Sequence, residues 1–214
     1  MNKATRAIVS TIGVIFGFGG MNHGFFETLQ GNKPTGSLMI EAIGESQRFW
    51  SQGNEPALTI VPNFLVTGVL AMLVGMAIIV WSIGFLHKKD GALVFLMLFI
   101  ALLLVGGGVG QVLFFVPAWL AATRIHKPLT FWRRVLSERT SRALGRTWKV
   151  ALVFFIVLIL FTLQVATFGI VPGVSDPDQI SMVMVVTLGI SWVLMWYLFI
   201  AGFAQDIAKP GILT

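Results

Sequence analysis

Histidine and carboxylate residues recur at helical spacing near the start of the chain, beginning in the stretch GGMNHGFFETLQGN. His23 and Glu27 lie four residues apart, and Glu41 and Glu45 repeat that spacing further along. Residues four apart share one face of an α-helix. One imidazole and three carboxylates could ligate a hard or borderline divalent metal, which makes His23, Glu27, Glu41 and Glu45 a candidate metal site. The alternative interpretation is an interfacial histidine beside loop carboxylates on a solvated surface.

Glycines at the same spacing point to helix packing. Small residues four apart let two membrane helices approach closely, although such patterns are common in membrane helices. A phosphate-binding GxGxxG loop would need a strand before it and a soluble helix after it, and the sequence offers neither. The predicted helix-packing positions are Gly13, Gly17, Gly20, Gly24, Gly106 and Gly110, with a weaker pair at Ala71 and Gly75.

Other chemistry is sparsely represented. The chain has no cysteine, which excludes disulfides, thiolate metal sites and cysteine nucleophiles. No GxSxG motif is present for a serine hydrolase. The later four apolar segments contain no Asp, Glu, Lys, Arg or His, which argues against a proton-driven transporter and against embedded haem. The sequence therefore leans away from an enzyme, and it identifies no cofactor.

Composition fixes the class of the protein. Of its 214 residues, 56% are hydrophobic and only 11% are charged. Soluble domains have about 45–50% apolar and about 25% charged residues, so this chain has too few charges to cover a soluble surface. We expect an all-α integral membrane protein, since continuous apolar runs form helices rather than spanning strands.

Five apolar runs are each close to the length of about 20 residues that crosses a bilayer as a helix. They predict a single polytopic domain, a bundle of about five transmembrane helices, with a polar loop at 25–60 after the first run. The predicted spans are roughly 7–24, 61–86, 92–116, 150–171 and 181–204.

A basic segment separates the third run from the fourth. Residues 117–149 hold eight lysines and arginines against one acid. Because basic residues favour the cytoplasmic side, this segment is expected inside, in a prokaryotic cytoplasmic membrane. Its mixture of tryptophans and arginines suggests a basic interfacial helix at anionic lipid headgroups, or else a charged loop that only sets topology. The predicted headgroup-binding residues are Arg133, Arg134, Arg139, Arg142 and Arg146.

Two topologies remain open. An unbroken third helix, which we favour, places eleven basic residues inside and four outside. A chain reversal at GGGVG, residues 106–110, places thirteen inside and two outside, but it puts non-helical backbone at membrane depth. The two topologies differ over which side carries the N-terminus, loop 25–60 and residues 87–91.

Three functions fit these features. The first is a non-catalytic accessory or oligomeric subunit packed through glycine-rich faces, with lipid and a second copy or another membrane protein as partners. The second is a passive channel or small-solute facilitator that uses GGGVGQ. The third is a metal-binding protein or enzyme at the membrane interface. The positive charge reports orientation, so no nucleic-acid partner is expected.

Overall fold

The computed structural model of the protein describes residues 1–208, and it confirms an all-helical bundle with very little sheet. Four helices are long and apolar enough to cross a membrane: α1 (Lys3–Leu29), α2 (Phe64–Gly84), α6 (Glu138–Phe168) and α7 (Pro177–Ala208). Three helices are shorter: α3 (Gly91–Leu104), α4 (Val112–Ala122) and α5 (Thr130–Val135). The loop after α1 carries an antiparallel pair of strands, β1 (Met39–Glu41) and β2 (Pro56–Leu58), and the 3-10 helix η1 (Glu45–Gln47).

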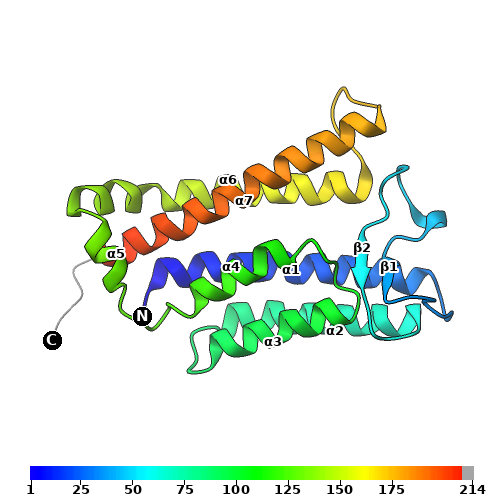
Figure 1. Cartoon of the computed structure of the whole chain (residues 1–214), viewed down its shortest axis with the longest axis horizontal. Coiled ribbons are helices and arrows are strands. Elements are labelled where there is room, and N and C mark those ends of the chain that lie inside the picture. Colours follow the sequence, from blue (N-terminus) through cyan, green and yellow to red (C-terminus); the bar gives the residue numbers. More distant parts are fainter. Residues whose placement is uncertain (209–214) are drawn as a thin grey trace.

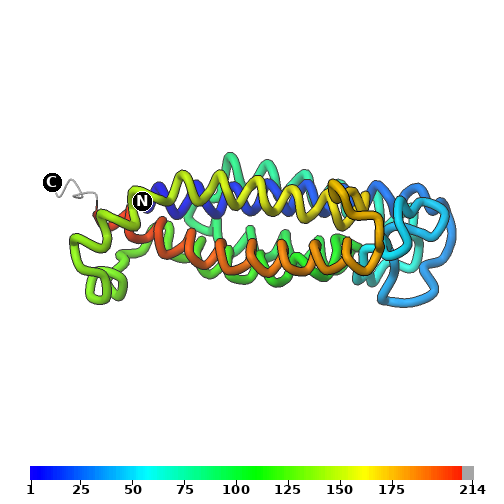
Figure 2. The backbone as a smooth tube through the Cα atoms, turned by 90° about the horizontal axis from the view of Figure 1, so that it is seen from above, coloured from blue at the N-terminus to red at the C-terminus, as the bar shows by residue number. Residues whose placement is uncertain are grey.

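The long helices lie roughly parallel or antiparallel in two layers (Figures 1 and 2). One layer holds α6, α1 and α2 side by side, and the other holds α7, α4 and α3. The core lies between the layers and is aromatic. Between the layers Phe16 of α1 stacks on Phe114 of α4, with ring centroids 4.8 Å apart, and within the second layer Phe99 of α3 stacks on Phe115 of α4 at 5.1 Å. α1 is therefore a central helix with neighbours on several sides.

The third apolar run is not one helix, so the prediction of an unbroken span was wrong. α3 ends at Leu104, the chain reverses, and α4 runs back beside it. Gly106 and Gly108 adopt φ of +95° and +87°, a conformation that helices do not use and that favours glycine. Backbone groups exposed by the reversal bond to the segment around β2: Gly106 N donates to Leu58 O at 2.9 Å, and Ile60 N to Leu104 O at 2.9 Å.

This reversal places the N-terminus, residues 87–91 and the basic segment at one end of the bundle, as in the alternative topology. Asn2 N donates to Ile125 O at 2.7 Å, and His126 Nε2 lies 2.8 Å from His87 O. We call this the basic end. Among the described residues it carries twelve of the fourteen lysines and arginines, whereas Lys33 and Arg48 lie at the opposite end, the loop end.

The first turn of α1 is capped by the far end of the described chain. The Asp206 carboxylate, in the last turns of α7, accepts hydrogen bonds from Ala4 N and Thr5 N, both at 2.9 Å, and from Thr5 Oγ1 at 2.7 Å. A carboxylate is favourable here because it satisfies free amide donors and opposes the positive end of the helix dipole. α7 and α1 are thereby joined at the basic end.

The helical part of the basic segment is divided between the short helix α5, which carries Arg133 and Arg134, and the start of α6. α5 has only six residues, and the backbone becomes extended at Leu136 and Ser137. Ser137 Oγ then accepts a hydrogen bond from Thr140 N at 3.1 Å, which caps a new helix. That helix, α6, continues without a break through the fourth apolar run to Phe168, where Gly169 ends it at φ +65°.

α1 and α2 make the closest contact in the bundle. Small residues face each other in an antiparallel register: Ser10 opposite Ser82, Gly17 opposite Gly75, and Gly24 opposite Gly68. A methyl group on Gly24 would lie 2.5 Å from Gly68 O, and one on Gly17 would lie 2.9 Å from Gly75 O. The spacing of seven residues keeps one seam in contact over the length of both helices.

Candidate functional site

An imidazole and a carboxylate meet near the loop end of α1. His23 Nε2 lies 3.5 Å from Glu55 Oε2, and both side chains are mostly buried. Glu55 comes from the loop just before β2. Among residues 1–208 it is the only non-glycine residue with a positive φ, which is +51°. A non-glycine residue held in this conformation is strained, and such strain is concentrated at functional sites. The loop therefore holds Glu55 against α1 in a conformation that it would not adopt alone.

The glycine-rich reversal covers His23 and Glu27. Glu27, one turn after His23, is fully buried. A methyl group on Gly106 would lie 2.2 Å from Glu27 Oε1, and one on Gly108 would lie 2.6 Å from the His23 ring. The stretches GGMNHGFFETLQGN and GGGVGQ are therefore packed against each other and form one site. Because they lie far apart in the chain, the sequence alone does not show this contact.

Several polar atoms in this site have no hydrogen-bond partner within the described protein. They are His23 Nδ1, both carboxylate oxygens of Glu27, and Gln111 Oε1. Gln111 is itself held in place, since its Nε2 donates to Gly107 O. Buried polar groups are nearly always paired, so this concentration distinguishes the site from the packed core around it.

A cavity of about 440 Å³ adjoins the site between α1 and α6. Its polar end holds Asn22, His23, Glu55, Gln164 and Thr167, and its remaining wall is apolar, formed by Val14, Ile15, Phe18, Leu160, Leu163 and Phe168. Phe18, Leu160 and Phe168 are also exposed on the outside of the bundle. The cavity consequently opens sideways, onto the surface that these apolar helices present.

The loop segment 48–55 connects the two helices at the polar end of this cavity. Trp50 Nε1 donates to Ala166 O of α6 at 3.0 Å, and its ring packs on Gly169. Gln52 Nε2 donates to Asp178 Oδ1 of α7 at 3.0 Å. Since Glu55 contacts His23 of α1, this short segment links α6 and α7 to α1 at the polar end of the cavity.

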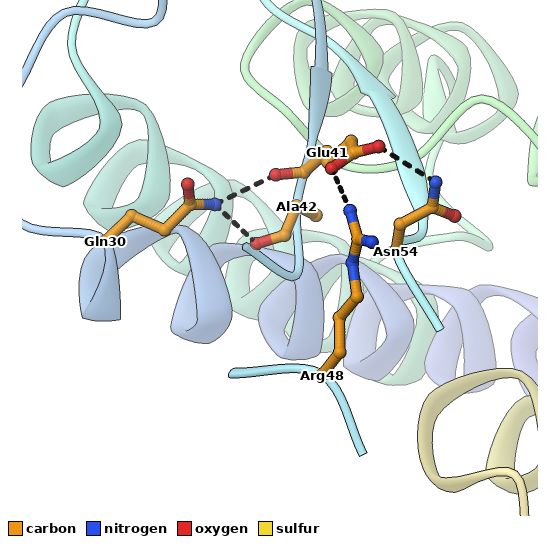
Figure 3. Close-up of polar contacts among 5 residues, drawn as sticks. All are labelled: Gln30, Glu41, Ala42, Arg48 and Asn54. Atoms are coloured by element: carbon orange, nitrogen blue, oxygen red, sulfur yellow. Dashed lines mark hydrogen bonds and ion pairs between the residues drawn. The ribbon is translucent and has the colours of Figure 1, made fainter. Parts of the chain in front are cut away.

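The four residues predicted as metal ligands are not brought together. Figure 3 shows Glu41 beside Arg48 and Asn54, whose Nδ2 donates to Glu41 Oε1 at 3.0 Å, while Gln30 Nε2 donates to the backbone oxygens of Glu41 and Ala42. Glu45 is exposed in η1. Within residues 1–208 no group of three or more His, Cys, Asp or Glu residues could hold a metal ion.

Sequence reasoning missed the true partner of His23. Glu55 is 32 residues away and belongs to no motif, so nothing in the spacing could reveal it. The glycines around His23 also do not end the helix, which continues to Leu29 and stops where Gly31 has φ +85°. Glu27 is therefore a helical residue facing the bundle interior, not a loop carboxylate.

The predicted packing glycines divide into three groups. Gly13, Gly17 and Gly24 lie against α2, and Gly20 lies against Leu102 of α3. Gly106 is in the reversal rather than a helix, and Gly110 has no neighbour within 4 Å of its methyl position. The interpretation of those last two as a helix-packing pair was wrong.

The predicted headgroup arginines all lie at the basic end. Arg133 and Arg134 are on α5, while Arg139, Arg142 and Arg146 are on the first turns of α6, and all five are exposed.

The chemistry available at the α1–α6 cavity is hydrogen bonding and proton exchange. A histidine beside a carboxylate can donate to, accept from, or take a proton from a bound polar group. Comparisons with protein-family models, with curated proteins and with solved structures gave no significant match.

Proposed function

We propose that this chain is a polytopic membrane protein that binds a lipid-soluble amphiphile in the α1–α6 cavity. One observation carries the proposal: a cavity with a His23–Glu55 pair at one end and apolar walls elsewhere opens on the apolar outer surface of the bundle. Its volume lies within the range of about 300–1,000 Å³ typical of small-molecule sites. A ligand dissolved in the bilayer could enter without crossing water.

The polar lining narrows the class of ligand. Glu55 and His23 are the ionisable groups lining this cavity, and the other polar groups there are the amides of Asn22 and Gln164 and the Thr167 hydroxyl. A negatively charged head would meet the Glu55 carboxylate, so the site favours a neutral or cationic head that donates hydrogen bonds. A long-chain alcohol, a phenol or an amine has this chemistry.

The same structure argues against the two other functions considered. The glycine reversal packs on Glu27, His23 and Leu102, so its backbone is covered rather than lining a path for solutes. The metal site lacks a gathered set of ligands among the described residues. We therefore propose that the protein is not a catalyst and acts as a ligand-binding subunit. A membrane-protein partner would need another surface than the glycine face of α1, which α2 occupies.

The basic end is proposed to face the cytoplasm. Twelve described basic residues lie at that end, and lysine and arginine near span ends are retained on the cytoplasmic side. The polar end of the cavity, close to the loop end, would then lie toward the outer leaflet.

Gly19 allows a direct test of the binding proposal. Gly19 lines the cavity, and a methyl group there would meet no protein atom within 4 Å, so we expect the side chain of Gly19→Leu to extend into the cavity. Gly189→Leu on exposed α7 is the matched control, since its methyl position is equally open. The measurement is native mass spectrometry of protein in nanodiscs titrated with dodecanol, dodecylamine and dodecyl phosphate.

We expect dodecanol or dodecylamine to bind the parent chain and Gly189→Leu, and to bind Gly19→Leu at least tenfold less. His23→Ala should also weaken binding, because it removes a contact with the polar head of the ligand and leaves the apolar wall unchanged. Equal binding by Gly19→Leu and Gly189→Leu would refute the proposal, and a preference for dodecyl phosphate would refute the assigned ligand class.

A further inference from the structure

A second, larger groove runs along α1 at the basic end. It has a volume of about 850 Å³ and lies between α1, α2 and α6, with Lys3 and Arg6 at its mouth. Ile83 of α2 and Ile156 of α6 form its sides. Val14 and Ile15 line its deep end, and the same two residues line the α1–α6 cavity. The two hollows therefore meet halfway along α1.

The hydroxyl groups in this groove are already used. Ser10 Oγ donates to Ser82 O at 2.7 Å, and Thr11 Oγ1 donates to Ala7 O at 3.0 Å. Because Thr11 donates within α1 and Ser10 donates across to α2, neither hydroxyl needs a ligand, and the wall below the two charged residues behaves as an apolar surface. The distance from Arg6 to Val14 along the helix is about 12 Å, which accommodates a large part of an acyl chain.

Within residues 1–208, no acidic side chain pairs with the charges at the mouth. Neither Lys3 nor Arg6 forms an ion pair within the described part of the chain. The nearby carboxylate of Asp206 is bonded to Ala4 N, Thr5 N and Thr5 Oγ1. Basic groups also surround the mouth: desolvation lowers the pKa of His87 most, and the nearby charges of Arg6, Lys88 and His126 lower it further.

We propose that this groove binds one anionic phospholipid, with its phosphate between Lys3 and Arg6 and an acyl chain along α1 toward Val14. Charge complementarity selects the head, and the apolar wall selects a lipid over a free phosphate or an acidic peptide. The site differs from the five arginines of α5 and α6, which have exposed side chains on other helices. It is independent of the ligand proposed for the α1–α6 cavity.

The test compares charge removal at the groove with charge removal beside it. Lys3→Gln/Arg6→Gln removes the two mouth charges. Lys88→Gln/Lys89→Gln removes two exposed basic residues at the same end that do not line the groove. Delipidated protein in detergent is titrated with phosphatidylglycerol and with phosphatidylcholine, and bound lipid is counted by native mass spectrometry. Inorganic phosphate at millimolar concentration is added as a competitor in a separate arm.

The parent chain and Lys88→Gln/Lys89→Gln should bind one phosphatidylglycerol about tenfold more tightly than phosphatidylcholine. Lys3→Gln/Arg6→Gln should lose that preference, and inorganic phosphate should not displace the lipid. Equal loss in both double variants would mean a general charge effect and would overturn the site. Displacement by phosphate would overturn the role of the acyl chain.

A variant that keeps both charges guards against a folding defect. Ala7 lines the groove and is only partly buried, so Ala7→Leu narrows the channel for the acyl chain. We expect Ala7→Leu to weaken phosphatidylglycerol binding several-fold with an unchanged melting temperature. Unchanged binding in Ala7→Leu would show that lipid is attracted to the charges without entering the groove, and the proposal would fail.

Discussion

At the scale of single residues, Gly106 is the clearest determinant of the covered site. It has φ +95°, and its missing side chain leaves room for the Glu27 carboxylate. Gly106→Ala should lower the free energy of unfolding by about 1–3 kcal/mol, from left-handed strain and overpacking together. Gly110→Ala is the control, because that position is open. Thermal unfolding in detergent measures both, and equal melting temperatures would contradict the packing described around Glu27.

Also at the scale of single residues, the stability of the protein should depend on pH through His87. Its pKa is lowered by partial burial and then by Arg6, Lys88 and His126, so the folded chain binds this proton less tightly than the unfolded chain, whose histidine pKa is about 6.5. The stabilising contribution is complete above that unfolded pKa, and it is lost as pH falls toward the lower folded pKa. His87→Asn should therefore flatten the decline in melting temperature between about pH 7.5 and pH 5.5. An unchanged slope would count against this linkage.

At the scale of elements, the seam between α1 and α2 should tolerate no bulk. Gly24 lies against Gly68 backbone, whereas Gly19 on the same helix faces the open cavity. Gly24→Leu should destabilise the protein by about 1–3 kcal/mol or more through overpacking, and Gly19→Leu should change stability little. Melting temperatures of the two variants in the same detergent provide the comparison. A silent Gly24→Leu would mean that α1 and α2 are not in backbone contact.

Some helices and contacts could be predicted from the sequence, and others could not. Long apolar runs predicted the four long helices, because their length and composition alone satisfy the bilayer. The break at Gly106 was visible as an alternative, but propensity could not decide it, since the bonds that stabilise the reversal come from Leu58 and Ile60. The partner of His23 was beyond prediction, because Glu55 reaches it only through the tertiary course of the loop. Helical spacing correctly grouped residues within α1 and carried no information across elements.

At the scale of the whole molecule, the reversal determines which loops share an end of the bundle, and so predicts which loops share a side of the membrane. Single substitutions in this cysteine-free chain, Lys89→Cys, Arg142→Cys and Asp176→Cys, place one thiol at each informative position. In intact cells an impermeant maleimide should label only Asp176→Cys, and permeabilisation should make the other two reactive. Labelling of Lys89→Cys together with Asp176→Cys would restore the unbroken third helix. Labelling of Arg142→Cys would reverse the proposed orientation.

The central position of α1 has a consequence for biosynthesis. α1 is the least apolar of the four long helices and the most buried, with more than half of its apolar window covered against less than a quarter for α7. The ribosome makes it before α2 closes its glycine seam and before the turn at 106–108 covers Glu27, and an ionisable side chain is unfavourable in lipid until then. Integration should therefore proceed as a group, with α1 held at the translocon until α4 emerges. Nascent chains arrested once residue 62 has left the ribosome should be extracted by alkaline carbonate, whereas chains arrested once residue 125 has left it should resist extraction.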